Sequence, residues 1–162
     1  MYLKHIVKRF FIVHPHEKCD SNGYYNNMIY PHSHSKILLK ISPLSFFSAT
    51  YGLYKNVPHL AIVPCSIGIT SQLYWKNPIH NCYMRYIDIC TVGCGLSYQI
   101  YYSFYSDATL LYITTVSIGL LFYPISNMYI RKNSWISVYL YSFLHIFGNI
   151  SNVILYSSKF TK

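Results

Sequence analysis

Long apolar runs separated by short polar connections dominate the pattern of the chain. Three runs lack Asp, Glu, Lys and Arg altogether, and a fourth holds a single acid near its start. Each run has about the 20 residues that an α-helix needs to cross the hydrocarbon core of a bilayer. These runs are residues 57–75, 86–106, 108–130 and 134–156. The pattern therefore predicts an all-α fold, a polytopic transmembrane helix bundle.

Residues 37–54 form a weaker fifth run, because Lys40 and Pro43 interrupt it. Pro43 fits the first turn of a helix, but the remainder to Tyr54 is short for a full span. A tilted, re-entrant or interfacial helix fits this run as well as a membrane-crossing one does. The predicted bundle therefore has four to five helices within residues 37–156.

Polar segments flank the bundle at both ends. Residues 1–36 form a basic N-terminal tail or loop, and residues 157–162 form a short polar tail. Apolar residues near the start share one helical face, which fits a short interfacial helix and equally a partly ordered tail. These residues are Leu3, Ile6, Val7 and Phe10.

Composition narrows the class to membrane proteins. Hydrophobic residues make up 52% of the chain and charged residues only 10%, against roughly 25% charged residues in soluble domains. Thirteen Lys and Arg residues outnumber four Asp and Glu residues. These cations flank the apolar runs, which favours contact with anionic lipid headgroups and disfavours nucleic acid as a partner.

The charges also predict an orientation if residues 37–54 cross the membrane. Short connections make consecutive helices antiparallel neighbours, so the loops at 76–85 and 131–133 then lie on the side of the N-terminal tail. That side collects most of the Lys and Arg residues, which places the N-terminus in the cytoplasm. With four spans the charges divide nearly evenly, and no orientation is predicted.

Asp88 is the only acid inside an apolar run. Arg85 precedes it by three residues, so the two side chains are neighbours on a helix and can pair at the membrane interface. Acids in membrane helices are also typical functional groups. Asp88 is therefore either a structural partner of Arg85 or a metal ligand or acid–base group at the mouth of a cavity.

A polar stripe marks the last apolar run. Spacings of three and four residues place its members on one helical face, and polar groups in hydrocarbon are costly, so this face should point into the bundle. The members are Ser142, His145, Asn149 and Asn152. They either join helices by hydrogen bonds or line a site in which His145 is a ligand or base, with partners such as Ser71.

Other His, Cys and Gly residues carry weaker signals. One loose group contains His and Cys, the side chains that bind zinc, but their spacing matches no familiar zinc finger. We therefore interpret these histidines as ordinary surface residues. The group consists of His14, His16, Cys19, His32 and His34. Cys90 and Cys94 share a helical face, yet the odd count of five cysteines indicates no disulfide framework. Gly93 and Gly95 beside them favour close contact between helices.

Two stretches resemble a known group of proteins. TSQLYWKNPIHNCYMRYIDI (70–89) and HIFGNISNVILYSS (145–158) are similar to small uncharacterised multispan membrane proteins of large DNA viruses and some protists. The residues that carry the likeness are Ser71, Tyr74, Trp75, Pro78, Arg85, Asp88, His145, Gly148, Asn149, Asn152 and Tyr156. The resemblance implies an integral membrane protein of a virion inner membrane or a host endomembrane.

A second, weaker resemblance is to the ceramidase and progestin-receptor superfamily of membrane hydrolases. Those proteins hold zinc with a Ser on an early helix, an Asp on the next and a His-x3-His pair on the last. Ser71, Asp88 and His145 match three of these positions, whereas Asn149 stands at the second histidine. The resemblance implies that Ser71, Asp88 and His145 would be catalytic, with Asp88 and His145 as metal ligands.

Two functional hypotheses follow. The first is a non-enzymatic structural or assembly component of a viral or host-derived membrane, with no cofactor. Its partners would be the bilayer, further copies of the chain, or a capsid or membrane protein that contacts the basic tail. The alternative is a metal-dependent lipid hydrolase with a degenerate zinc site. No phosphate-binding loop, nucleophile elbow or zincin helix is visible, which favours the first hypothesis.

Overall fold

The computed structural model describes residues 28–76, 78–79, 82–130 and 132–160. Apart from two isolated β-bridges, regular secondary structure in these residues is helical, and the predicted all-α class is confirmed. The helices are α2 (His32–Ile41), α3 (Leu44–Tyr54), α4 (Pro58–Lys76), α5 (Tyr83–Ser103), α6 (Thr109–Tyr129) and α7 (Ser134–Ser157). The predicted interfacial helix and the group His14, His16 and Cys19 lie outside the described residues.

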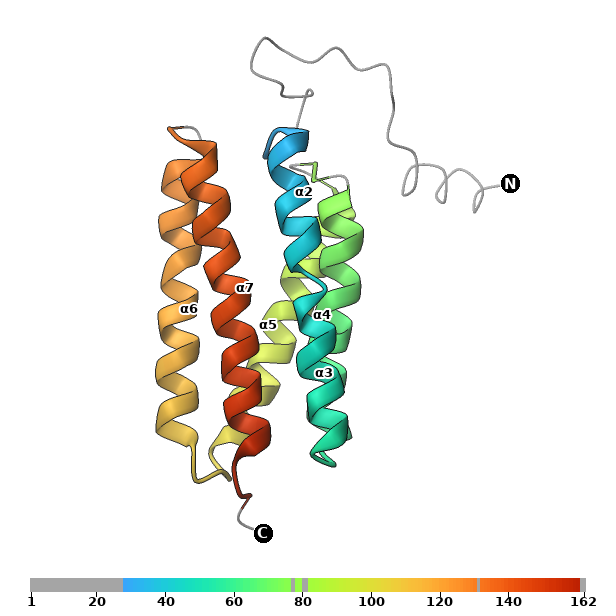
Figure 1. The fold of residues 1–162 in the computed structure, drawn as a ribbon, viewed down its shortest axis with the longest axis vertical. Coiled ribbons are helices and arrows are strands. Elements are labelled where there is room, and N and C mark those ends of the chain that lie inside the picture. Colours follow the sequence, from blue (N-terminus) through green and yellow to red (C-terminus); the bar gives the residue numbers. More distant parts are fainter. Residues whose placement is uncertain (1–27, 77, 80–81, 131, 161–162) are drawn as a thin grey trace, which may run out of the picture.

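Two of the helices, α6 and α7, are long and apolar enough to cross a membrane by length and composition. They form a tight antiparallel hairpin (Figure 1). At Gly119 a Cβ would lie only 3.0 Å from Cβ of Phe147, so the absence of a side chain there sets the close approach of the two helices. Among the described helices, α4 and α5 do not meet the same criterion.

The weak run at 37–54 folds as two helices rather than one. Ser42 closes α2 by donating its backbone N–H to Leu38, and Pro43 occupies the N-cap of α3. Proline cannot donate a backbone hydrogen bond, so the series of helical backbone hydrogen bonds is interrupted at this point. Helix α2 begins at His32, five residues before the predicted run, and it continues the line of α3 in Figure 1.

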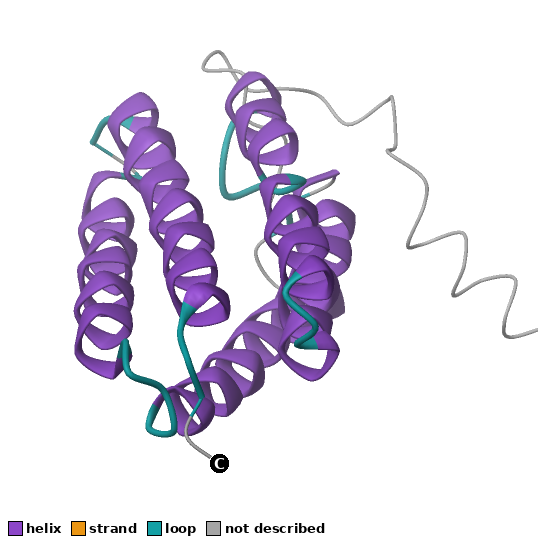
Figure 2. Cartoon of the chain, turned by 60° about the horizontal axis from the view of Figure 1, so that its bottom comes forward, coloured by secondary structure: helices purple, strands orange, loops and turns teal. Residues whose placement is uncertain are grey.

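The remaining helices pack around the hairpin unevenly. Helix α4 lies between α3 and α5, while α7 contacts both α2 and α3. Helix α5 packs along α4 but touches α6 only sparsely, and Figure 2 shows α5 running obliquely across one end of the molecule. The sparse α5–α6 contact leaves room between the hairpin and the other helices.

Burial in this bundle differs from that of a typical soluble protein, although two apolar clusters are also buried. The interior holds many hydroxyl groups and the acid Asp88, whereas large apolar side chains cover the outside of every helix from α3 to α7. On α6 alone, Leu110 is 80% exposed and Met128 is 68% exposed. Soluble proteins rarely expose contiguous apolar surface of this extent.

Candidate functional site

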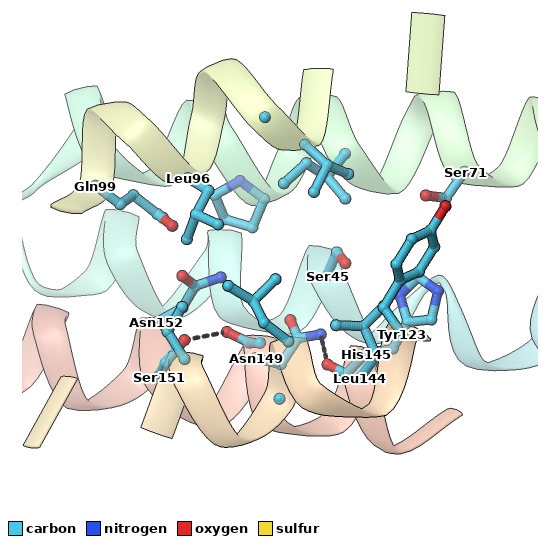
Figure 3. A pocket seen from close by; sticks show the side chains of 18 of the residues that line it. Ser45, Ser71, Leu96, Gln99, Tyr123, Leu144, His145, Asn149, Ser151 and Asn152 are labelled. Atoms are coloured by element: carbon cyan, nitrogen blue, oxygen red, sulfur yellow. Dashed lines mark hydrogen bonds between the residues drawn. The ribbon is translucent and has the colours of Figure 1, made fainter. Parts of the chain in front are cut away.

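A cavity of about 340 Å³ lies inside the bundle, enclosed mainly by α4, α5, α6 and α7. Aliphatic side chains from all four helices form much of its wall. Its polar lining consists of Ser45, Ser71, Asp88, Gln99, Tyr123, Tyr141, His145, Asn149, Ser151 and Asn152. In Figure 3, Ser71, Tyr123 and His145 gather at one end, whereas Gln99, Ser151 and Asn152 lie at the other.

The three residues predicted as catalytic candidates all line this cavity, although they come from three helices. Ser71 lies on α4, Asp88 on α5 and His145 on α7. Ser71 donates its hydroxyl to Oδ1 of Asp88 at 2.7 Å, and Thr70 donates to the same oxygen at 2.8 Å. The carboxyl group is therefore bound by hydroxyls across the α4–α5 interface.

The pairing of Asp88 with Arg85 stays a prediction. The carboxyl group accepts hydrogen bonds from Thr70 and Ser71 on α4, and Arg85 is not among the residues that line the cavity. Asp88 is 6% exposed, and a buried acid needs hydrogen-bond donors to be tolerated. Spacing along α5 alone does not predict these partners, because they come from a different helix.

The polar stripe of α7 divides into members that join helices and members that do not. Ser142 donates to the carbonyl of Val138 within its own helix. Asn149 donates to the carbonyl of His145 at 2.7 Å and accepts from Ser48 of α3 at 2.6 Å. Asn149 is therefore occupied in packing α3 against α7, while Asn152 lines the cavity and forms no side-chain hydrogen bond within the described residues.

His145 has a buried ring nitrogen with unused bonding capacity. Its ring lies beside that of Tyr141, with centroids 5.5 Å apart. Its Nε2 atom is buried and has no hydrogen-bond partner among the described residues. A buried polar atom in this state costs about 1–3 kcal/mol, which a ligand that bonds to it would offset.

Two glycines shape the cavity in a way that the sequence did not distinguish. A Cβ atom at Gly95 would lie 2.6 Å from Cγ1 of Val63, so Gly95 allows close helix contact as expected. Gly93 was expected to do the same, but a Cβ there meets nothing within 4 Å, and the same holds at Gly148. Both residues line the cavity, so they provide space rather than contact.

The site offers few ligands for a metal ion. No group of three His, Cys, Asp or Glu side chains is arranged to hold one within the described part of the chain. A catalytic zinc takes three protein ligands, whereas this cavity presents Asp88, His145 and an Asn149 amide already bonded at both its oxygen and its nitrogen. The residues present do not fit the zinc site that the hydrolase resemblance implies.

Comparison with protein families, curated proteins and solved structures gives no match to this chain. The resemblances to viral membrane proteins and to membrane hydrolases therefore stay predictions. The function has to be argued from the bundle and its cavity.

Proposed function

We propose that the chain is a polytopic membrane protein with five passes and a structural rather than enzymatic role in its membrane. The proposal rests on the large apolar side chains outside the bundle together with the many polar side chains inside it. Exposed side chains such as Ile69 on α4 and Ile87 on α5 are apolar, whereas Ser71 and Gln99 on the same helices are buried. In lipid such an arrangement is stable, because the apolar side chains face hydrocarbon and the polar ones find partners inside.

The lengths of the helices support five passes. At 1.5 Å per residue, α4 and α5 are about 28 and 31 Å long, close to the ~30 Å hydrocarbon core. The first pass is the composite of α2 and α3, which together extend from His32 to Tyr54, about 34 Å. Short connections then place alternate helix ends on opposite sides.

The basic residues support one orientation. The ends of the helices that carry Lys36, Lys76, Arg85 and Lys132 lie together, and Lys55 and Lys159 lie at the opposite ends (Figure 1). By the positive-inside rule the first group faces the cytoplasm, and the N-terminal tail lies on that side. The tail is then available to anionic headgroups or to a capsid or membrane protein partner.

Cysteine mapping tests this topology. Single cysteines are introduced, one at a time in a cysteine-free background, at Lys55, Lys76, Asp107, Lys132 and Lys159. In sealed vesicles a membrane-impermeant maleimide should label positions 76 and 132 from one side and positions 55, 107 and 159 from the other. Labelling of all five positions from the same side would refute the five-pass arrangement.

A lipid hydrolase is the second candidate, because Ser71, Asp88 and His145 line the same cavity. It predicts stoichiometric zinc in the purified protein and loss of lipid turnover in Ser71→Ala, with Ser142→Ala as an active control. Metal-free protein without turnover would refute it. Stoichiometric zinc together with turnover would instead refute the structural role.

A further inference from the structure

We propose that the cavity binds one single-chain, uncharged amphiphile, such as a monoacylglycerol, with its hydroxyl head at the Ser71–Asp88–His145 end. Nothing in the structural role proposed above requires a ligand, so this inference goes beyond it. It depends on the membrane location only for the route by which the ligand enters.

The shape of the cavity limits the ligand to one chain. Asp88 and Gln99 both line it and stand eleven residues apart on α5, which is about 16 Å along a helix. A volume of about 340 Å³ over that length describes a narrow channel, which suits one extended hydrocarbon chain better than two chains side by side.

The lining combines apolar and polar side chains, which matches an amphiphile. Aliphatic residues such as Val92, Leu96 and Val116 line the cavity beside the polar ones, as is usual for sites that bind small molecules. Gly93 and Gly148 keep the channel open, since a side chain at either position would extend into space and not into protein.

Polar groups with unused bonding capacity gather at one end (Figure 3). His145 Nε2 is buried without a partner among the described residues, and no hydrogen bond joins the hydroxyls of Tyr123 or Tyr141 to the described part of the chain. At the other end both polar atoms of Gln99 are engaged, by Tyr112 and Tyr156, which leaves Asn152 there. The head group therefore belongs at the His145 end.

The charge of the lining selects the head group. Asp88 is the one acidic residue among the described residues that line the cavity, and no Lys or Arg lines it, so an anionic head such as a carboxylate would find no cation to pair with. Two hydroxyl donors already satisfy its Oδ1 atom, so a cationic head is not needed to stabilise it. Hydroxyl groups can donate to Asp88 and bond to His145 in either tautomer.

A lateral opening provides access from the membrane. Ile89 on α5 and Leu120 on α6 are 47% and 41% exposed although they line the cavity, and these two helices touch only sparsely. A lipid in the surrounding bilayer can therefore enter between these helices. The head-group end lies nearer the basic helix ends, which matches the orientation of a lipid from that leaflet.

Photolabelling of the full chain in phosphatidylcholine vesicles tests the proposal. The probe is a monoacylglycerol with a diazirine in the middle of its chain, and unlabelled monoacylglycerol is the competitor. We expect saturable labelling of residues on α5 and α7 that line the cavity, and a loss of about tenfold or more in Gly148→Leu. Gly93→Leu should also reduce the labelling.

The matched control is Cys94→Leu, which places the same side chain on an exposed position of α5. It should label like the wild type. Equal labelling of wild type and Gly148→Leu, with both folded by circular dichroism, would overturn the proposal. If the cysteine mapping still gives the expected topology, the five-pass arrangement is supported although the ligand proposal has failed. The two proposals can therefore fail independently.

Three further probes with the same diazirine chain test the head group. They carry a carboxylate, an amine, or a second acyl chain with a phosphocholine head. For each of these probes, the wild type and Gly148→Leu should be labelled to the same extent. Stronger saturable labelling by the acid, the amine or the two-chain lipid in the wild type would overturn the assignment of the ligand.

Discussion

Ser71 of α4 donates a hydrogen bond of 2.7 Å to the carboxyl group of Asp88 on α5. The bond connects two neighbouring helices at the end of the cavity where His145 also lies, and Thr70 adds a second bond to the same oxygen. Bonds between helices inside a bilayer are worth about 0.6–2 kcal/mol. This pair therefore stabilises the α4–α5 interface and fixes the position of the one acid in the cavity wall.

We predict that Ser71→Ala lowers the free energy of unfolding by about 1 kcal/mol, because Asp88 loses one of its two donors. Ser97→Ala is the control, since its exposed hydroxyl bonds only to the carbonyl of Gly93 in its own helix. Thermal unfolding in detergent, followed by circular dichroism, measures both. Equal stability of the two variants would contradict the role of the Ser71–Asp88 bond.

Asn149 and Asn152 lie three residues apart on α7 but have different surroundings. Asn149→Ala should lower the free energy of unfolding by about 1–2 kcal/mol, because the buried hydroxyl of Ser48 loses its bond to α7 and keeps only the longer one to the carbonyl of Ser45 in its own helix. Asn152→Ala should change it by less than about 0.5 kcal/mol, since the side chain forms no bond to lose. The same unfolding experiment compares them, and a larger loss in Asn152→Ala would show that the assignment is reversed.

These two asparagines also show how far the sequence could predict the site. Their spacing placed both on one face of a helix, and that face does line the interior. Spacing along one helix carries no information about Ser48 on α3, which decides that Asn149 joins helices and Asn152 does not. Gly93 and Gly95 are indistinguishable in sequence for the same reason.

The helices themselves were easier to predict, because an uncharged run of the right length leaves few alternatives. The exception is the start of α2, where His32, Ser33, His34 and Ser35 have no apolar pattern. Their helix is supported by a tertiary contact: the ring of His34 lies 4.0 Å from that of Trp135 on α7. Such a contact depends on the tertiary fold and cannot be predicted from the local sequence.

A hydroxyl triad fastens the segment before α2 to the α6–α7 hairpin. Tyr30 bonds to Ser137 at 2.7 Å, and Ser137 lies 3.0 Å from Ser126. Tyr30→Phe removes the hydroxyl with little change in volume and should lower stability by about 1 kcal/mol. Tyr83→Phe is the control, because Tyr83 is 81% exposed. Indistinguishable melting temperatures would exclude a stabilising triad.

The two kinds of glycine in the bundle predict opposite responses to the same substitution. Gly52→Ala places a Cβ 2.9 Å from Cβ of Ala61 and 3.0 Å from the ring of Tyr156, so α3 has to move away from α4 and α7. Overpacking of this kind costs about 1–3 kcal/mol. Gly148→Ala meets nothing within 4 Å and gains helix propensity of about 0.5–1 kcal/mol.

Thermal unfolding of both alanine variants and the wild type tests this, because the two variants should change stability in opposite directions. Gly52→Ala should melt below the wild type and Gly148→Ala at or above it. A single methyl group is also too small to fill the channel, so Gly148→Ala should retain labelling by the monoacylglycerol probe that Gly148→Leu loses. A strongly destabilised Gly148→Ala would mean that protein, and not open space, surrounds this position, and the cavity would have to be smaller than described.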